Sequence, residues 1–185
     1  GVERLVCIGV LKGSVFFLVD LMQRLRTPVV VDFFQTSSYG SGVKSGEVRI
    51  RKDVDLALRG EHVLLVEDIV DTGYTLRTIL DLLRFRGAKS VKLCALLDKK
   101  AAREIEVPID YRGFEIGNEF VVGYGLDFDE KYRNLTSTER DGWTAYGRQF
   151  FPKNDRGEDV KQYGIATYVR AMVMRQMLGL ALVTQ

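Results

Sequence analysis

The stretch Val63–Thr75, VLLVEDIVDTGYT, decides how this chain folds. An apolar run typical of a buried strand leads directly into Glu67 and Asp68. A short apolar pair then leads into Asp71–Thr75, where a helical pattern begins. The order predicts a strand, a turn and a helix, with both acids at the carboxyl edge of the strand. An acidic helix cap alone would explain Asp71, but neither the paired acids nor a glycine in the turn.

A turn of this kind suits an anion. The N–H groups that begin a helix lack partners within it, and the helix dipole favours negative charge there. The hydroxyl groups of Thr72 and Thr75 lie in the same turn. The adjacent carboxylates of Glu67 and Asp68 suit ribose hydroxyls or a hard cation such as Mg²⁺. The sequence therefore indicates an anion-binding turn beside an oxygen-rich site.

Outward from this stretch, short apolar runs alternate with helical patterns. Strands or extended segments are expected at Leu5–Val10, Pro28–Phe34, Val48–Arg51, His62–Val66, Ser90–Leu97, Tyr111–Ile116 and Phe120–Tyr124. Helices are expected at Val15–Leu25 and Thr75–Arg86, and a Ser/Gly-rich loop at Thr36–Gly46. The alternation predicts an α/β fold, a parallel sheet flanked by helices on both faces. Ligands of such sheets bind beyond the carboxyl ends of the strands, so the site is expected after Val10, Val66 and Leu97.

Composition limits the function classes. The chain has 185 residues and a net charge of +2, which argues against a dedicated nucleic-acid binder. Cys7 and Cys94 each lie in an apolar run, as buried thiols do, and fit a reducing cytoplasm. No signal-peptide pattern opens the chain, and charges interrupt the late apolar segment, so neither secretion nor a membrane span is expected. A cytoplasmic location is the expectation.

The sequence pattern changes near residue 135, where the alternation of apolar runs and helical patterns ends. Residues 1–135 are expected to form one core domain. Residues 136–185 are expected to form a polar arm and a C-terminal helical extension at Tyr163–Leu182. The apolar positions of that helix suggest that it packs or forms an oligomer contact.

VLLVEDIVDTGYT resembles the PRPP-binding motif of the type I phosphoribosyltransferases, and most resembles the hypoxanthine-guanine branch. The similarity runs from about Leu5 to Leu135. It implies a type I phosphoribosyltransferase-like core whose PRPP-binding residues include Glu67, Asp68, Asp71, Thr72, Gly73, Tyr74 and Thr75. Asp71 would be the general base that accepts the purine N7 proton. Glu67 and Asp68 would hold the ribose hydroxyls and, through water, Mg²⁺.

Other segments resemble family motifs in the same order. Leu11–Ser14, LKGS, is similar to the pyrophosphate loop, whose Leu–Lys peptide is often cis, and this would place Lys12 and Gly13 on pyrophosphate. Without the resemblance it is a strand-to-helix turn with Ser14 as a cap. Ser38 and Tyr39 would belong to a loop that closes on pyrophosphate, and Arg133 would contact the same group.

The purine site is implied by two further segments. Lys99, after the strand VKLCALLD, corresponds to the lysine that donates to the purine 6-oxo group. In FVVGYGLD, Phe120 would stack on the base and Val121 would offer its backbone. Asp127 ends this segment beside the purine site and would hold a second Mg²⁺ on pyrophosphate.

The resemblance thus implies a Mg²⁺-dependent enzyme that joins PRPP to hypoxanthine or guanine, giving IMP or GMP and pyrophosphate. Homo-oligomers are usual in the family. Three alternatives stay open: an enzyme that uses xanthine, an RNA-binding regulator on the same fold, and a catalytically impaired PRPP-binding fragment. The last arises because family members carry a longer segment before the first strand, so the hood over the base is expected to be incomplete.

Overall fold

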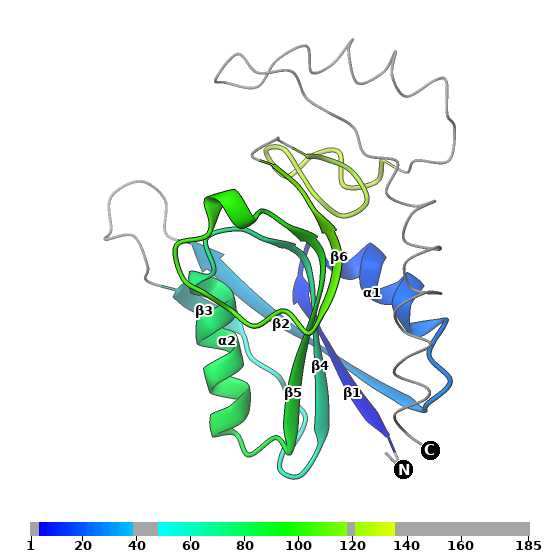
Figure 1. Cartoon of the computed structure of the whole chain (residues 1–185). Coiled ribbons are helices and arrows are strands. Elements are labelled where there is room, and N and C mark those ends of the chain that lie inside the picture. Colours follow the sequence, from blue (N-terminus) through cyan, green and yellow to red (C-terminus); the bar gives the residue numbers. More distant parts are fainter. Residues whose placement is uncertain (1–3, 39–47, 118–120, 136–185) are drawn as a thin grey trace.

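The computed structural model describes residues 4–38, 48–117 and 121–135 (Figure 1). Its elements, in chain order, are β1 (Leu5–Leu11), α1 (Val15–Met22), β2 (Val29–Ser38), β3 (Val48–Lys52), β4 (His62–Val70), α2 (Tyr74–Phe85), β5 (Ser90–Asp98), a short 3-10 helix η1 (Lys100–Ala102) and β6 (Tyr111–Glu115). The strands form a 6-stranded sheet in the order β3-β2-β1-β4-β5-β6. The expected arm and helix, 136–185, lie outside the described residues, so the division at residue 135 stays a prediction.

The predicted α/β class is confirmed, with one correction to the sheet. Strands β2, β1, β4, β5 and β6 run parallel, but β3 pairs antiparallel with β2. Only residues 39–47 separate β2 from β3. A parallel return needs a crossover of a dozen residues or more, whereas an antiparallel return does not. The sheet is therefore mixed.

The two helices cover opposite faces of the sheet (Figure 1). Successive strand residues point to opposite faces, so Val6 and Ile8 join the cluster that contains α2, whereas Cys7 joins the cluster that contains α1. Each helix buries one apolar stripe against its face, and Leu76, Ile79, Leu80 and Leu83 form that of α2. Burial on both faces explains why β1, β4 and β5 read as nearly continuous apolar runs.

Several predicted boundaries were wrong. β4 continues past Val66 to Val70, because its pairing with β5 continues as far as Asp98. β2 likewise extends into the predicted loop, to Ser38, because β3 pairs with it there. α1 ends at Met22 rather than Leu25. Pairing with a neighbouring strand therefore lengthened strands beyond their apolar runs.

The predicted extended segment Phe120–Tyr124 is also wrong for its described part. Tyr124 has a φ of 54°, and Gly123 and Gly125 have φ values of 93° and 100°. Gly123 and Leu126 form an isolated antiparallel bridge, so the chain turns back on itself here. Val121, Tyr124 and Leu126 are buried in the α1 cluster. Their apolar pattern reflects burial in a tight turn rather than a strand.

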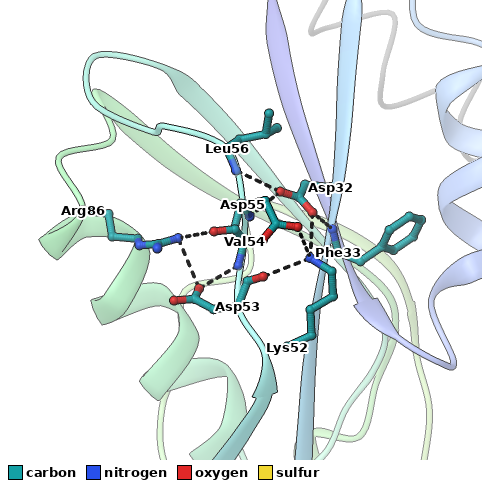
Figure 2. Close-up of polar contacts among 8 residues, drawn as sticks. All are labelled: Asp32, Phe33, Lys52, Asp53, Val54, Asp55, Leu56 and Arg86. Carbon is teal, nitrogen blue, oxygen red and sulfur yellow. Dashed lines mark hydrogen bonds and ion pairs between the residues drawn. The ribbon is translucent and has the colours of Figure 1, made fainter.

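A buried carboxylate fixes the base of the β2–β3 hairpin (Figure 2). Asp32 accepts hydrogen bonds from the backbone N–H groups of Phe33 at 2.7 Å, Asp55 at 2.8 Å and Leu56 at 3.1 Å. Lys52 Nζ lies 3.2 Å from Asp32 Oδ1. The segment that leaves β3 is thereby tied to the middle of β2.

The cysteine prediction is confirmed, since Cys7 and Cys94 are buried free thiols. Burial raises the pKa of the Cys7 thiol to about 12. Neither helix in the described part of the chain has the length and apolar character to cross a membrane.

Candidate active site

The segments that the sequence singled out meet at one edge of the sheet. β1, β4 and β5 are parallel, so their carboxyl ends lie together. β1 ends in the Leu11–Lys12 peptide, which is cis, as the resemblance implied. β4 ends with Glu67, Asp68 and Val70, and β5 ends immediately before Lys99. The segments expected to carry the site therefore lie at one edge of the sheet, and the site itself stays a prediction.

Gly13 lies against the acids of β4. A Cβ at position 13 would lie 1.7 Å from Asp68 Oδ2, so only glycine fits beside that carboxylate. A Cβ on Gly125 would lie 1.9 Å from Gly13 O, and Gly125 has a φ of +100°. Three segments far apart in the sequence, at Gly13, Asp68 and Gly125, are therefore in close contact.

The two acids of β4 are electrostatically coupled. Asp68 is 7% exposed, and Glu67 Oε2 is buried with no hydrogen-bond partner among the described residues. Burial, and then the charge of Asp68, raise the pKa of Glu67 well above its usual value. Both acids had been expected to follow the strand, but they lie within β4. A buried carboxylate oxygen without a partner is a feature that a hydroxyl group or a hard cation would satisfy.

The turn before α2 is held by backbone contacts. Gly73 has a φ of +96°, and a Cβ there would lie 2.2 Å from Ile105 O. Gly73 occupies the cap position, and no side chain makes a capping hydrogen bond. Asp71 is exposed and is not the helix cap that its position alone would suggest. Among the described residues, the Asp71 carboxylate is not used as a cap, and no capping side chain accepts from the N–H groups at the start of α2.

Lys12 and Arg133 are joined by an acid. Lys12 Nζ lies 2.7 Å from Glu130 Oε2, and Arg133 Nη2 lies 3.3 Å from the same oxygen. Arg133 Nη2 also lies 2.7 Å from Asp127 Oδ1, and its Nη1 donates to Gly125 O at 2.7 Å. The predicted pyrophosphate residues Lys12 and Arg133 thus lie on one charged patch, in which Glu130 bridges the two cations and Asp127 pairs with Arg133.

Lys99 begins the segment that follows β5. Its side chain is half-buried, and its N–H donates to Val70 O at 2.9 Å. Val121 is buried in the α1 cluster. Phe120 and Tyr39 lie outside the described residues. Ser38 is the last residue of β2 and the last described residue before position 48.

Two residues in contact with these segments escaped the sequence analysis. Arg103 donates to backbone carbonyls of the turn before α2 and pairs with the buried Asp98. It comes from a charged run, KKAARE, that is indistinguishable from an exposed surface. Glu130 is equally hidden among charged neighbours. Only tertiary contacts identify either residue.

The described residues contain no group of three or more His, Cys, Asp or Glu side chains placed to hold a metal ion. The oxygen ligands that the resemblance implied for the ion are the Glu67–Asp68 pair and Asp127. Mg²⁺ commonly keeps several waters and binds through one or two carboxylates plus substrate phosphates. The carboxylate pair fits such a partly substrate-borne ion rather than an all-protein cage.

Comparisons with known proteins identify the family of this chain. The model of the phosphoribosyl transferase domain matches residues 1–129. A hypoxanthine phosphoribosyltransferase from Haemophilus influenzae is 49% identical over 135 residues, which are 72% of this chain and 75% of that protein.

Solved structures agree as well. A hypoxanthine-guanine phosphoribosyltransferase from Bacillus anthracis aligns with a TM-score of 0.69 at 44% identity, covering 72% of this chain and 79% of that one. The Trypanosoma cruzi hypoxanthine phosphoribosyltransferase, in complex with the product IMP, aligns with a TM-score of 0.68 at 43% identity, covering 73% of this chain and 75% of that one. A family match across most of the chain and this similarity to known enzymes and solved structures lead to one conclusion: the chain belongs to the phosphoribosyl transferase domain family.

Proposed function

We propose that this chain transfers the phosphoribosyl group of PRPP to hypoxanthine or guanine, giving IMP or GMP and pyrophosphate in purine salvage. The observation that carries the proposal is the contact of Gly13 with Asp68 and Gly125, which brings three motif-bearing segments into contact. The relatives named above are enzymes of this kind. That similarity favours an enzyme over the RNA-binding alternative.

The reaction needs stabilisation of a leaving anion. Breaking the bond from ribose C1 to pyrophosphate leaves positive charge on the sugar and increases negative charge on the leaving group. Lys12 and Arg133 supply positive charge on one patch, and the amides of Lys12 and Gly13 supply donors. Ser38 and Tyr39 would complete the pyrophosphate contacts.

The sugar and its 5-phosphate would lie over the carboxyl end of β4. Residues Asp71–Thr75 would hold the phosphate through N–H groups and hydroxyls at the start of α2. The Glu67–Asp68 pair would hold the ribose hydroxyls, which satisfies the buried Glu67 Oε2. Mg²⁺, bound by these acids through water and by Asp127, would supply further positive charge for the pyrophosphate group.

The purine would lie between the sugar and the end of β5. Lys99 would donate to the 6-oxo group, which selects a carbonyl over the amino group of adenine. Val121 would offer backbone groups to the edge of the base, and Phe120 would stack on it. Asp71, which is exposed and is not the cap of α2, would accept the N7 proton as N9 attacks C1.

Two further features belong to the proposal. Homo-oligomers are usual among the enzymes this chain resembles, so we expect a homo-oligomer. The two free buried thiols suit a reducing cytoplasm.

A single assay tests the function. The purified chain is incubated with PRPP, Mg²⁺ and one of hypoxanthine, guanine, xanthine or adenine, and the nucleotide formed is measured. We expect IMP and GMP, and a loss of about a hundredfold or more in kcat for Asp71→Asn. Asp81→Asn on the exposed face of α2, where Asp81 pairs with Arg77, is the matched control.

Each other outcome has a definite meaning. Nucleotide from xanthine in preference to hypoxanthine would replace the substrate assignment with the xanthine alternative. No nucleotide from any base, despite Mg²⁺-dependent PRPP binding, would mean that the chain is a PRPP-binding protein without transferase activity.

A further inference from the structure

The Arg103 side chain links the carboxyl ends of β4 and β5. It is 6% exposed and forms an ion pair with Asp98, the last residue of β5. Its Nη2 also donates to Val70 O at 3.2 Å, and its Nε donates to Asp71 O at 2.8 Å. One guanidinium group therefore contacts a buried carboxylate and two consecutive backbone carbonyls.

The Asp98 carboxylate forms the ion pair that orients this guanidinium group. Its side chain is 2% exposed, and a carboxylate so buried needs strong partners. Arg112 is the second partner, with Nε at 2.8 Å from Asp98 Oδ2. Arg112 is 44% exposed, and its other ion pair is to Glu115 in β6. The two arginines thus share one carboxylate, but Arg103 contacts the turn, whereas Arg112 belongs to β6 and pairs there with Glu115.

The three carbonyls that lead into the turn are not held equally. Val70 O also accepts from Lys99 N at 2.9 Å. Thr72 O accepts from Glu104 N at 3.0 Å and Ile105 N at 2.9 Å. Among the described contacts, Asp71 O accepts from the Arg103 side chain. The orientation of the peptide that follows the Asp71 side chain therefore depends on Arg103.

We infer that Arg103, oriented by Asp98, is a positioning residue for phosphoribosyl transfer, and that it fixes the Asp71 peptide and joins the PRPP turn to the strand end that carries Lys99. The inference rests on the function proposed above. The planar guanidinium presents several N–H donors in a fixed arrangement, which suits simultaneous contact with a carboxylate and two carbonyls. A lysine ammonium at the end of a flexible chain cannot reproduce that arrangement.

A matched pair of substitutions tests this role. Arg103→Lys and Arg112→Lys each keep the charge and each alter one partner of Asp98, but only the first removes donors from the turn. Steady-state kinetics are measured with PRPP and hypoxanthine, at a temperature well below the unfolding midpoint of both variants. We expect kcat to fall about tenfold or more in Arg103→Lys, because a small misplacement of a reacting group is costly.

The pattern of parameters separates positioning from general damage. The KM for hypoxanthine should change little in Arg103→Lys, since the contacts of the Arg103 side chain among the described residues are to Asp71 O, Val70 O and Asp98, and not to the Lys99 ammonium. Arg112→Lys should keep the wild-type kcat. A thermal unfolding midpoint lowered equally in both variants, with kcat lost only in Arg103→Lys, would support the inference.

Other results would overturn it. Equal kcat values in the two variants would show that Arg103 only balances the charge of Asp98. Failure of Arg103→Lys to fold where Arg112→Lys folds would assign Arg103 a purely structural role. If the wild-type chain itself forms no nucleotide, it is the proposed function that fails. Loss of nucleotide formation in Arg103→Lys alone concerns only the role of Arg103.

Discussion

Gly13 has no room for a side chain because Asp68 Oδ2 occupies the place where its Cβ would lie, at 1.7 Å. The segment after β1 is therefore positioned by the acid of β4, not by its own turn alone. This contact joins the expected pyrophosphate loop to the expected ribose site.

Gly13→Ala should therefore disable the site. The methyl group would push either Asp68 or the Lys12–Gly13 segment out of place, and we expect kcat/KM to fall about a hundredfold or more. Gly60→Ala is the control for general destabilisation, since its φ of +81° strains an alanine but nothing lies within 4 Å of the added Cβ. Nucleotide formation and thermal unfolding of both variants are measured. Wild-type kinetics in Gly13→Ala would show that the segment moves without consequence.

We expect the Glu130 carboxylate to compete with pyrophosphate for Lys12 and Arg133. Hydrogen bonds from Lys12 and then Arg133 lower the pKa of Glu130, so its carboxylate is charged at neutral pH on the patch that would bind pyrophosphate. Glu130→Gln should tighten binding of pyrophosphate about two- to fivefold, as expected for an exposed ion pair, and more at low salt. Product-inhibition constants measure this.

Asp129→Asn supplies the control for Glu130. Asp129 is the neighbouring acid and pairs with Lys131 at 3.0 Å. It should leave the pyrophosphate inhibition constant unchanged. Equal constants in the wild-type chain and in Glu130→Gln would mean that the acid moves aside at no cost.

The segments that meet at the carboxyl edge of the sheet could be predicted from the sequence better than the residues around them. Residues within the motifs, such as Asp68 and Gly13, could be recognised in the sequence because an acid pair or a glycine turn directly follows an apolar run. Parallel pairing of the strands brought these residues together. Arg103 and Glu130 could not be recognised, because an arginine or glutamate in a charged run looks the same whether it is exposed or in contact with the site. Strand ends were also missed, since β4 continues through Glu67 and Asp68 by pairing with β5, which no local pattern records.

The Phe120–Tyr124 segment shows a different limit. Its apolar residues predicted a strand, but the structure has Gly123 and Gly125 at positive φ and buries Tyr124 in the α1 cluster. The glycines permit the turn, and the apolar side chains are explained by the core they enter. Apolar character predicted burial correctly and secondary structure wrongly.

Lys99 should affect the base and not the sugar. Its ammonium is expected to donate to the purine 6-oxo group, and loss of a charged hydrogen bond raises the KM for hypoxanthine about ten- to hundredfold in Lys99→Met. The KM for PRPP should change little. Lys100→Met, at the exposed neighbour that begins η1, is the matched control. A KM for hypoxanthine that is equal in the two variants would remove Lys99 from the purine site.

Asp32 should make the fold sensitive to acid. Burial opposes ionisation of Asp32, but hydrogen bonds from the backbone of Phe33 and Leu56, from Lys52 and from Asp55 outweigh it, so its pKa in the folded chain lies below the usual value. A carboxyl whose pKa is lower when folded stabilises the fold above its unfolded pKa, which is about 3.9. That stability is lost as the pH falls through the lower, folded pKa.

Asp32→Asn tests this directly, with urea unfolding at pH 7, 5, 4 and 3 as the measurement. At neutral pH the variant should lose about 1–3 kcal/mol of unfolding free energy, the worth of hydrogen bonds to a charged group. The difference from the wild-type chain should shrink as the pH falls below about 4, because Asp32 of the unfolded wild-type chain is then becoming protonated, while Asp32 of the folded chain keeps its charge until the pH reaches its lower pKa. Asp55→Asn is the control: its carboxylate also lies 3.0 Å from Lys52 Nζ but is 87% exposed, so it should cost little. A difference for Asp32→Asn that stays constant from pH 7 to 3 would mean that shape, not charge, holds the base of the hairpin.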